Sequence, residues 1–490
     1  MGVFRAESAP GGPCEAVGVT RGPAGAHPAH RGSPCPTREG VGRRQTTREP
    51  AARTYAGALP IVPVRARGLT IEGADGRRYL DCASGAGALA LGHNHPVVLG
   101  AIREVLDSGA PLLVPDLTTP VRDAFTEELF RTLPPGLADR ARVRFCGPAG
   151  EDAMEAAFRL VRTATGRAEI LGALDLTSRR DGTGLGHPVP RLPLPAGAVL
   201  DPVHREGAVL PASDDWTRRV RGLTAARSVP LIADESMTGV GRTGAFWAVD
   251  HSGVTPDVMV LSHAIGGSLP LAVLVYREDL DVRRSDGRSD TFPGNQLAMA
   301  AGTATLAHVR RHQLARRAAT LGDRLLAQLR SLPARFPCVR DVRGRGLMIG
   351  VELMDPDVAR ADHEVALAGA EAAPVGPEVA PGEREVAPVD AAGTRAPDHS
   401  PGSGPAASAL ATAVQRECLR RGLIVDVGGP HANVVRLLPP LTISDEQAAA
   451  VLDRLTDAVE EVARRPTRGG RTPPPHRRPR RHGDPAERAG

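Results

Sequence analysis

The chain has no lysine: every residue in its combined lysine and arginine count of 61 is an arginine, in a sequence of 490 residues. Arginine keeps its proton at any ordinary pH, and its guanidinium is not a primary amine. A Schiff base between a lysine of this protein and a carbonyl compound is therefore excluded. Asparagine is nearly as rare and occurs only at Asn94, Asn295 and Asn433.

Cysteine pairs, aromatic residues and long apolar runs are also scarce. Aromatic residues make up 3% of the chain, and the six cysteines are scattered without a C-x-x-C pair. This pattern gives no disulfide framework and no metal site, and it is typical of a reducing cytoplasm. No apolar run approaches the roughly 18 residues of a membrane span, and the N-terminus has no apolar signal core. We therefore expect a cytoplasmic protein with neither a metal nor a membrane partner.

Three segments lack apolar periodicity and are rich in glycine, proline, alanine or arginine: 1–50, 357–408 and 464–490. Such segments cannot bury enough apolar surface to fold. We expect a disordered N-terminal extension, a low-complexity insert and a disordered basic tail. The formal net charge of +5 comes partly from the tails. Because the basic tail has no interleaved aromatic residue, we expect it to be solvated and not bound to nucleic acid.

The rest of the chain has the patterns of alternating strands and helices. From residue 141 a strand, a glycine-rich turn and a helix follow one another, which indicates an α/β core with a largely parallel sheet, followed by a smaller α+β region. The expected strands are 199–203, 230–233, 258–261 and 347–353, with a hairpin over 64–82, and the expected helices are 97–108, 119–133, 153–165, 213–226, 312–331, 409–422 and 444–463.

Two strand ends carry ionisable side chains. The stretch DVMVLSHAIGGSLP (257–270) places His263 between an apolar strand and a glycine-rich turn. Imidazole titrates near neutral pH, so His263 is a candidate general base. LIADE (231–235) ends in two carboxylates, and ligands of open α/β sheets bind at the carboxyl ends of strands. Asp234 is placed to pair with a cation, although an N-cap or a surface pair fits the pattern equally well.

Three weaker signals accompany these. GPAGEDAMEAAFRL (147–160) places a glycine-containing turn before a helix, and free N–H groups at a helix N-terminus suit a phosphate. Any tight strand–helix turn has the same pattern, and the carboxylate of Glu151 would repel phosphate. Thr291 is a candidate phosphate contact or a plain N-cap. Arg436 is a lone charge in an apolar strand, where a structural carboxylate partner is the default and a substrate carboxylate the alternative.

Taken in order along the chain, these motifs resemble class III (omega) aminotransferases, which are fold-type-I pyridoxal-phosphate enzymes. The sequence motifs FCGPAG and TATGR are most similar to those of the 2,4-diaminobutyrate 4-aminotransferase branch. The resemblance covers roughly residues 51–356 and 409–460. It is carried by GLTIEGADGRRYLDCASGAGALALGHNHP (68–96), VRFCGPAGEDAMEAAFRLVRTATGR (143–167), VPLIADESMTGVGRTGAFWAVDHSGVTPDVMVLSHAIGGSLPLAV (229–273), TFPGNQLAMAAGTATL (291–306), VRGRGLMIGVEL (342–353) and VVRLLPPLTIS (434–444).

The resemblance implies roles for several residues. Asp234 matches the aspartate that holds the pyridinium nitrogen of the cofactor. Gly150 and Glu151 fall in the turn that cradles its phosphate, and Thr291 matches the threonine that reaches the phosphate from a neighbouring subunit. Arg436 matches the strand arginine that binds a substrate carboxylate. A homodimer is implied.

The cofactor site departs from the family pattern. The family motif LSKAIGG carries the Schiff-base lysine, and the corresponding residue here is His263. The family sequence DEVQ is here Asp-Glu-Ser-Met, so that Ser236 replaces an apolar residue on the cofactor ring and Met237 replaces the glutamine that reaches the ring oxygen. Other departures are the missing aromatic near 177–179, the altered EPVQGEGG segment at 201–208, the short stretch between 180 and 197, and Pro430 in place of an arginine.

We therefore expect a class III aminotransferase homologue whose amino transfer between glutamate and an amino-acid semialdehyde is lost or greatly impaired. The alternatives are a non-covalent pyridoxal-phosphate enzyme with His263 as base, as in some fold-type-I sugar dehydratases, and a non-catalytic partner of an active paralogue. The expected division is an extension (1–50), an N-terminal segment of the small domain and link (51–110), a large cofactor-binding α/β domain (111–310), a small α+β domain (311–463) containing the insert, and a tail (464–490).

Overall fold

The computed structural model describes residues 59–113, 117–173, 194–204, 209–282, 294–355, 357–358 and 404–464. The expected disordered extension at 1–50, almost all of the insert at 357–408 and nearly all of the tail at 464–490 lie outside these ranges, as does the segment near 177–179. Among the described residues, no helix combines the length and hydropathy needed to cross a bilayer.

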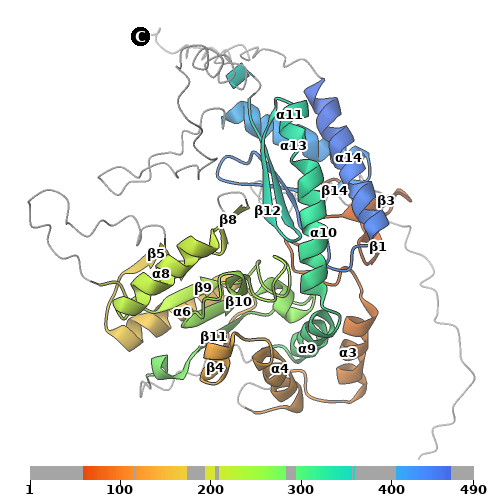
Figure 1. Ribbon diagram of the computed structural model, residues 1–490. Helices are drawn as coiled ribbons and strands as arrows, with labels where there is room; N and C mark the ends of the chain where they lie inside the picture. The colour runs from red at the N-terminus through yellow and green to blue at the C-terminus, as the bar shows by residue number, and fades with distance from the viewer. Residues whose placement is uncertain are drawn as a thin grey trace, which may run out of the picture.

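The largest sheet is six-stranded in the order β4-β11-β10-β9-β6-β5 (Figure 1). β10, β9, β6 and β5 run parallel, and β11 lies antiparallel between β10 and β4. The expected α/β core with a mostly parallel sheet is thus confirmed. The strands are β4 (Ala141–Phe145), β5 (Ile170–Gly172), β6 (Gly197–Leu200), β9 (Leu231–Asp234), β10 (Val258–Leu261) and β11 (Val273–Arg277).

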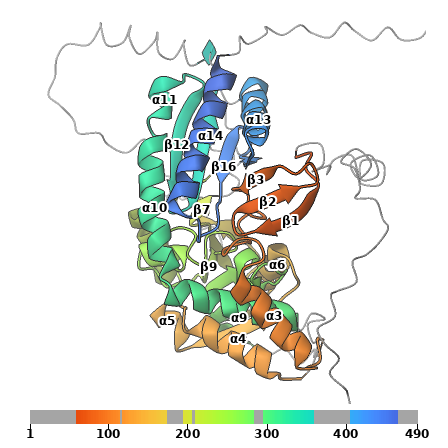
Figure 2. The ribbon, with the colours of Figure 1, turned by 90° about the vertical axis from the view of Figure 1, so that its right-hand side faces the viewer.

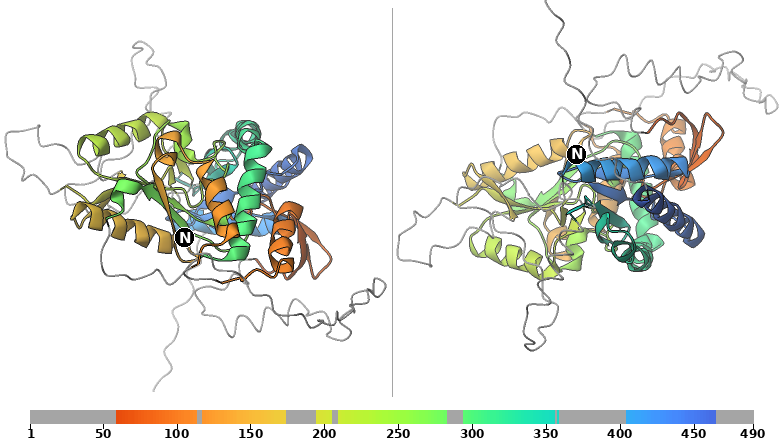
Figure 3. Two further views of the ribbon diagram at one scale, coloured as in Figure 1. Left: turned by 90° about the horizontal axis from the view of Figure 1, so that it is seen from below. Right: turned by 90° about the horizontal axis from the view of Figure 1, so that it is seen from above.

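This sheet is buried on both faces, because the residues of its central strands, apart from Asp234 at the end of β9, are apolar and point alternately to opposite sides. Ile232 packs in a cluster with Ala157 and Val161 of α6 (Gly150–Thr165). Leu231 joins the other cluster, which includes Val220 of α8 (Asp214–Ala226). Seen from below and from above, α6 and α8 lie on opposite sides of the strands (Figure 3).

A second, antiparallel sheet has the order β12-β13-β16-β15. Its strands are β12 (Val339–Arg345), β13 (Met348–Leu353), β15 (Asp426–Gly428) and β16 (Val434–Leu437). The long helices α10 (Leu314–Leu329), α13 (Pro405–Arg420) and α14 (Asp445–Ala463) gather around it, and α10 runs from the level of the large sheet up beside β12 (Figures 1 and 2).

The N-terminal segment forms a third sheet with a late strand of the chain. β1 (Pro63–Arg67), β2 (Thr70–Gly73) and β3 (Arg78–Asp81) are antiparallel neighbours, and β14 (Leu423–Ile424) joins β3 in parallel. α3 (Pro96–Asp107) and α4 (Pro120–Phe130) both pack against α9 (Gln296–Arg311) (Figure 2). The remaining short elements are α5 (Pro135–Ala138), β7 (Val203–His204), β8 (Leu210–Pro211), η2 (Ala248–His251), η3 (His263–Gly266), η4 (Glu278–Leu280) and α11 (Leu332–Arg335).

Several expectations need correction. The strand expected over 199–203 is two strands, β6 and β7, interrupted before Val203. α10 begins at Leu314 because Gln313 has a φ of +50°, which separates it from α9. α13 begins at Pro405, inside the expected insert, since proline at the first helical position needs no hydrogen-bond partner for its nitrogen. The side chain of Asn295 caps α9, and Thr291 itself lies outside the described residues.

Candidate active site

Asp234 and His263 follow neighbouring parallel strands of the large sheet. Asp234 is the last residue of β9 and is paired in register with Val260 of β10. The amide of Glu235 donates to the Val260 carbonyl at 2.9 Å. Asp234 is only 4% exposed, so the surface-pair alternative for it is wrong. Its Oδ1 accepts the Ser236 amide at 3.0 Å, which orients the carboxylate.

His263 begins the 3-10 turn η3 directly after β10 and Ser262. It is half-buried, and its φ of +53° lies in the left-handed region. That region costs a non-glycine residue on the order of 1 kcal/mol, and such residues cluster at functional sites, where the surrounding structure holds them in place. The turn therefore presents an ionisable ring in a fixed backbone conformation at a strand end.

The N-terminus of α6 meets both strand ends. A Cβ atom added to Gly150, the first residue of α6, would lie 3.3 Å from Ser236 Oγ and 3.5 Å from Ser262 Cβ. The glycine is what allows this close approach. Three segments far apart in the sequence thus converge: the glycine turn, the residues after Asp234 and those before His263. Glu151 is exposed on the first turn of α6.

The two other sequence candidates that the structure describes lie at or beyond the edge of this convergence. Met237 is half-buried and packs on a small cluster that includes Leu438 and Met348 of the second sheet. Arg436 lies on β16 of that sheet and forms an ion pair with Asp426 on β15. Thr291 falls outside the described residues.

We did not predict a role for Glu235 from the sequence, although the two consecutive carboxylates of LIADE indicate that this residue belongs to the strand end. The side chain is buried, and its oxygens accept the Val249 amide at 2.9 Å and the Thr238 hydroxyl at 2.5 Å. Burial raises the pKa of Glu235 to about 7, so that the carboxyl is poised to gain a proton near neutrality. Ser236 and Ser262, whose side chains border Gly150, were likewise found only in the fold.

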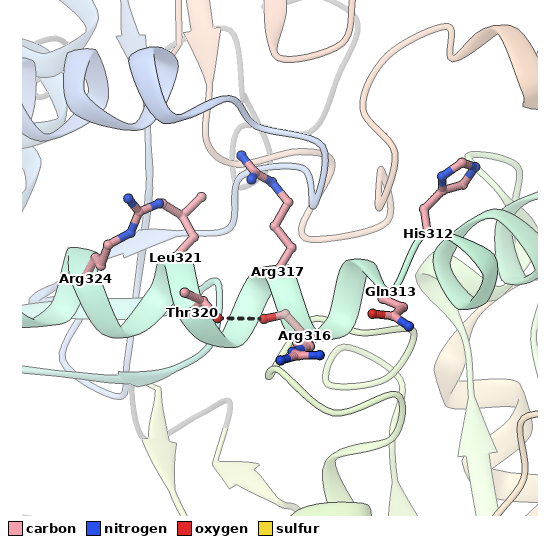
Figure 4. Close-up of a pocket in the computed structure, with 7 residues that line it drawn as sticks. All are labelled: His312, Gln313, Arg316, Arg317, Thr320, Leu321 and Arg324. Atoms are coloured by element: carbon pink, nitrogen blue, oxygen red, sulfur yellow. Dashed lines mark hydrogen bonds between the residues drawn. The ribbon is translucent and has the colours of Figure 1, made fainter.

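A separate cavity of about 370 Å³ lies along α10 (Figure 4). It is lined by His312, Gln313, Arg316, Arg317, Thr320, Leu321 and Arg324. It contains none of the residues that the sequence singles out. Asp445 of α14 pairs with both Arg317 and Arg324, at 3.0 and 3.1 Å. Within the described ranges, no group of His, Cys, Asp or Glu side chains is arranged to hold a metal ion.

Comparison with known proteins finds relatives that match most of the chain. The family model described as class III aminotransferases matches residues 51–174 and 195–459. A diaminobutyrate–2-oxoglutarate aminotransferase of Rhizobium meliloti (strain 1021) is 40% identical over 473 residues, covering 86% of this chain and 93% of the relative. A second one, from Haemophilus influenzae, is 34% identical over 470 residues, covering 86% of this chain and 94% of the relative.

Solved structures share the fold at lower identity. An acetylornithine aminotransferase from Elizabethkingia anophelis superposes with a TM-score of 0.65 at 21% identity, covering 86% of this chain and 99% of its own. An ornithine aminotransferase from Plasmodium yoelii gives a TM-score of 0.66 at 20% identity, covering 87% of this chain and all 100% of its own. At such identities the likeness shows the fold alone.

Proposed function

Because the chain belongs to the class III aminotransferase family, which implies pyridoxal phosphate as cofactor, we propose that it is a diaminobutyrate–2-oxoglutarate aminotransferase homologue with transaminase activity lost or greatly impaired. The names of its relatives support the substrate class, an amino acid and a 2-oxo acid. The observation that carries the loss is His263 directly after β10, the strand that pairs with the one ending in Asp234, in a chain without lysine.

The described residues fit some of the cofactor's non-covalent contacts but not a covalent one. The buried carboxylate of Asp234 suits a protonated ring nitrogen, and the first turn of α6 at Gly150 offers free amides for a phosphate. Glu151 weakens that phosphate site by its charge. Met237 packs as an apolar side chain and offers no amide to a ring oxygen. Pyridoxal phosphate, when bound, supplies an electron sink for the substrate carbon.

At position 263 this chain has an imidazole where the family has the amine of a lysine. Imidazole forms no stable Schiff base, but it moves protons near neutral pH. Covalent attachment and proton transfer by the lysine are each worth orders of magnitude in rate, so the change removes the larger part of catalysis. Proton transfer by His263 in a non-covalent reaction is the alternative, and the half-buried ring directly after β10 supports it.

We extend the proposal to a dimer in the cytoplasm. Leu106, Leu112, Leu113 and Leu117 are 50%, 45%, 65% and 65% exposed around the α3–α4 connection, and such apolar surface favours a protein partner. The partner is a second copy or an active paralogue. Asp234 and His263 belong to one chain, so a partner would not restore this chain's own site, although Thr291 would be available to the partner's site.

The chain without lysine serves as its own control, because it has no side-chain amine that could form an adduct. The purified protein is incubated with pyridoxal phosphate and its visible spectrum is recorded before and after glutamate. It is then reduced with borohydride and mapped by mass spectrometry. We expect no adduct on any internal peptide and no conversion of the cofactor to its amine form. Conversion by glutamate would overturn the loss of activity.

The matched variants are His263→Lys and Arg330→Lys. Each introduces a single lysine, the first after β10 and the second at the exposed C-cap of α10. We expect a stoichiometric adduct at position 263 and only background labelling at position 330. Equal labelling of both variants would contradict the placement of His263 where the family keeps its lysine.

A further inference from the structure

One row of residues crosses the second sheet beside Arg436. Gly350 of β13 and Asp426 of β15 are the register partners of Arg436, and Arg343 of β12 is the partner of Gly350. Directly opposed residues of antiparallel strands lie on the same face. Arg436 and Asp426 therefore share one face of this sheet, and they form an ion pair on it.

That face is directed toward the candidate active site. Side chains alternate along a strand, so Met348 of β13 lies on the same side as Gly350, the register partner of Arg436, and it packs against Leu438 in one small cluster. Leu438 packs in the cluster to which Met237 belongs, three residues after Asp234. Arg345, on the same side of β12 as Arg343, pairs with Asp214 at the start of α8 at 2.9 Å. Both contacts join this face of the second sheet to segments that belong to the large sheet and its helices.

Glycine makes room for the guanidinium. A Cβ atom added to Gly428 would lie 2.7 Å from both Cζ and Nε of Arg436. Among the described residues, Nε of Arg436 is buried and has no hydrogen-bond partner. The Arg436 side chain is 17% exposed and that of Asp426 is 34% exposed. The ion pair is thus partly open to solvent, whereas Nε of Arg436 is packed against Gly428.

We propose that Asp426 is a specificity-determining residue that works together with Arg436. Arg436 receives the α-carboxylate of an amino acid and Asp426 its α-ammonium, which holds the α end and leaves the terminal amine toward Asp234 and His263. An arginine alone would accept any carboxylate. A carboxylate beside it repels acids that carry no ammonium group, so the pair selects an α-amino acid. This inference rests on the proposed function for its substrate class.

The test compares three ligands of similar length by calorimetry on the full chain, with and without pyridoxal phosphate. 2,4-Diaminobutyrate has both α groups, 4-aminobutyrate lacks the α-ammonium, and 1,3-diaminopropane lacks the carboxylate. We expect 2,4-diaminobutyrate to bind at least about tenfold more tightly than either of the others, the size of a charge-assisted hydrogen bond. Equal affinities, or no binding of 2,4-diaminobutyrate, would overturn the proposal. This comparison needs no variant.

Variants assign the selectivity to one residue. Asp426→Asn should weaken 2,4-diaminobutyrate about tenfold or more and leave 4-aminobutyrate unchanged or bound more tightly, because the repelling charge is gone, whereas Asp426→Glu should keep the preference. Asp341→Asn is the matched control, because Asp341 also pairs with an arginine of this sheet, Arg343, at 3.0 Å. Equal weakening of both ligands by Asp426→Asn would mean that Asp426 only positions Arg436. Turnover by the wild type would overturn the proposed function without touching this preference.

Discussion

The carboxyl group of Glu235 is held in the protein interior one residue after the strand that ends in Asp234. Its two hydrogen-bond donors, the Val249 amide and the Thr238 hydroxyl, do not offset the loss of water. Asp234 is also buried, yet it lies at the strand end where Gly150, Ser236 and Ser262 meet. Adjacent carboxylates thus have different environments, one inside the loop that follows β9 and one at the site.

Glu235 makes stability depend on pH with a definite sign. Its pKa is raised from 4.5 to about 7, so its contribution is fully present below pH 4.5 and is lost as the pH rises through about 7. Glu235→Gln, which mimics the neutral acid, should flatten this fall in the free energy of unfolding, which amounts to about 3 kcal/mol. Urea unfolding at pH 5 and pH 8 measures it. An unchanged pH slope would contradict the assignment.

At the scale of single elements, the N-terminus of α9 depends on one of the three asparagines in the chain. Oδ1 of Asn295 accepts the Leu297 and Ala298 amides at 2.9 and 3.2 Å. Asn295→Ala should lower the free energy of unfolding by about 1 kcal/mol, since two end amides lose their acceptor. Asn295→Asp retains the acceptor and should cost little. Chemical denaturation of both variants distinguishes capping from a general effect of substitution.

The packing of α3 on α9 contains a row of three histidines. The ring centroids of His95 and His308 are 4.9 Å apart, and those of His308 and His312 are 4.2 Å apart. Burial lowers the pKa of His95 and of His308, and the neighbouring histidines lower both further. Protonation therefore places like charges next to one another in a partly desolvated contact.

The row of three histidines predicts that the folded protein loses stability in acid. Because the folded pKa values lie below the ordinary value of 6.5, the stabilising contribution is present above pH 6.5 and is lost as the pH falls below it. His308→Gln should reduce the loss of melting temperature between pH 7 and pH 5. His431→Gln, outside the row, serves as the control for the general effect of replacing a histidine. A steeper loss in His308→Gln would show that the row is not its source.

At the scale of the whole molecule, one buried arginine connects the three larger sheets of the described chain. Arg242 is 2% exposed and follows the loop after β9. Its guanidinium donates to the carbonyls of Leu347, Gly87 and Pro439, which belong to segments next to the second and the N-terminal sheets. Burial lowers the pKa of Arg242 to about 10, and the group stays charged at neutral pH. The charge is balanced by backbone dipoles.

Removing this arginine should loosen the assembly of the sheets. Arg242→Ala should lower the free energy of unfolding by about 3 kcal/mol, because three carbonyls lose a charged donor and a cavity remains. Hydrogen exchange should rise first in the segments around Gly87 and Leu347. Arg330→Ala, an exposed arginine at the end of α10, should change stability by no more than about 0.5 kcal/mol.

Much of the fold was readable from local pattern. The apolar strand 258–261 has the predicted bounds, and the helices around 97–108, 213–226 and 444–463 were confirmed to within a residue or two. β11 was missed because the apolar run Val273–Arg277 follows a glycine-rich turn without a break that marks its start. β14 and β15 are too short to show a period. The strands that were not predicted are those that form only by pairing with other parts of the chain.

The sequence by itself determined which chemistry this chain lacks. No folding creates a primary amine from arginine or histidine, so the absence of lysine excludes a lysine Schiff base whatever the structure. It also determined that Asp234 and His263 end apolar strands, because that follows from local order along the chain.

Only the tertiary structure decided which of these residues meet. The register of β9 with β10 and the close approach of Gly150 to Ser236 depend on strands and a helix that are distant in sequence. The ion pair of Arg436 with Asp426, and the burial that raises the pKa of Glu235, depend equally on packing between segments. Side-chain neighbours and local dielectric are properties of the folded chain, and no pattern within one segment contains them.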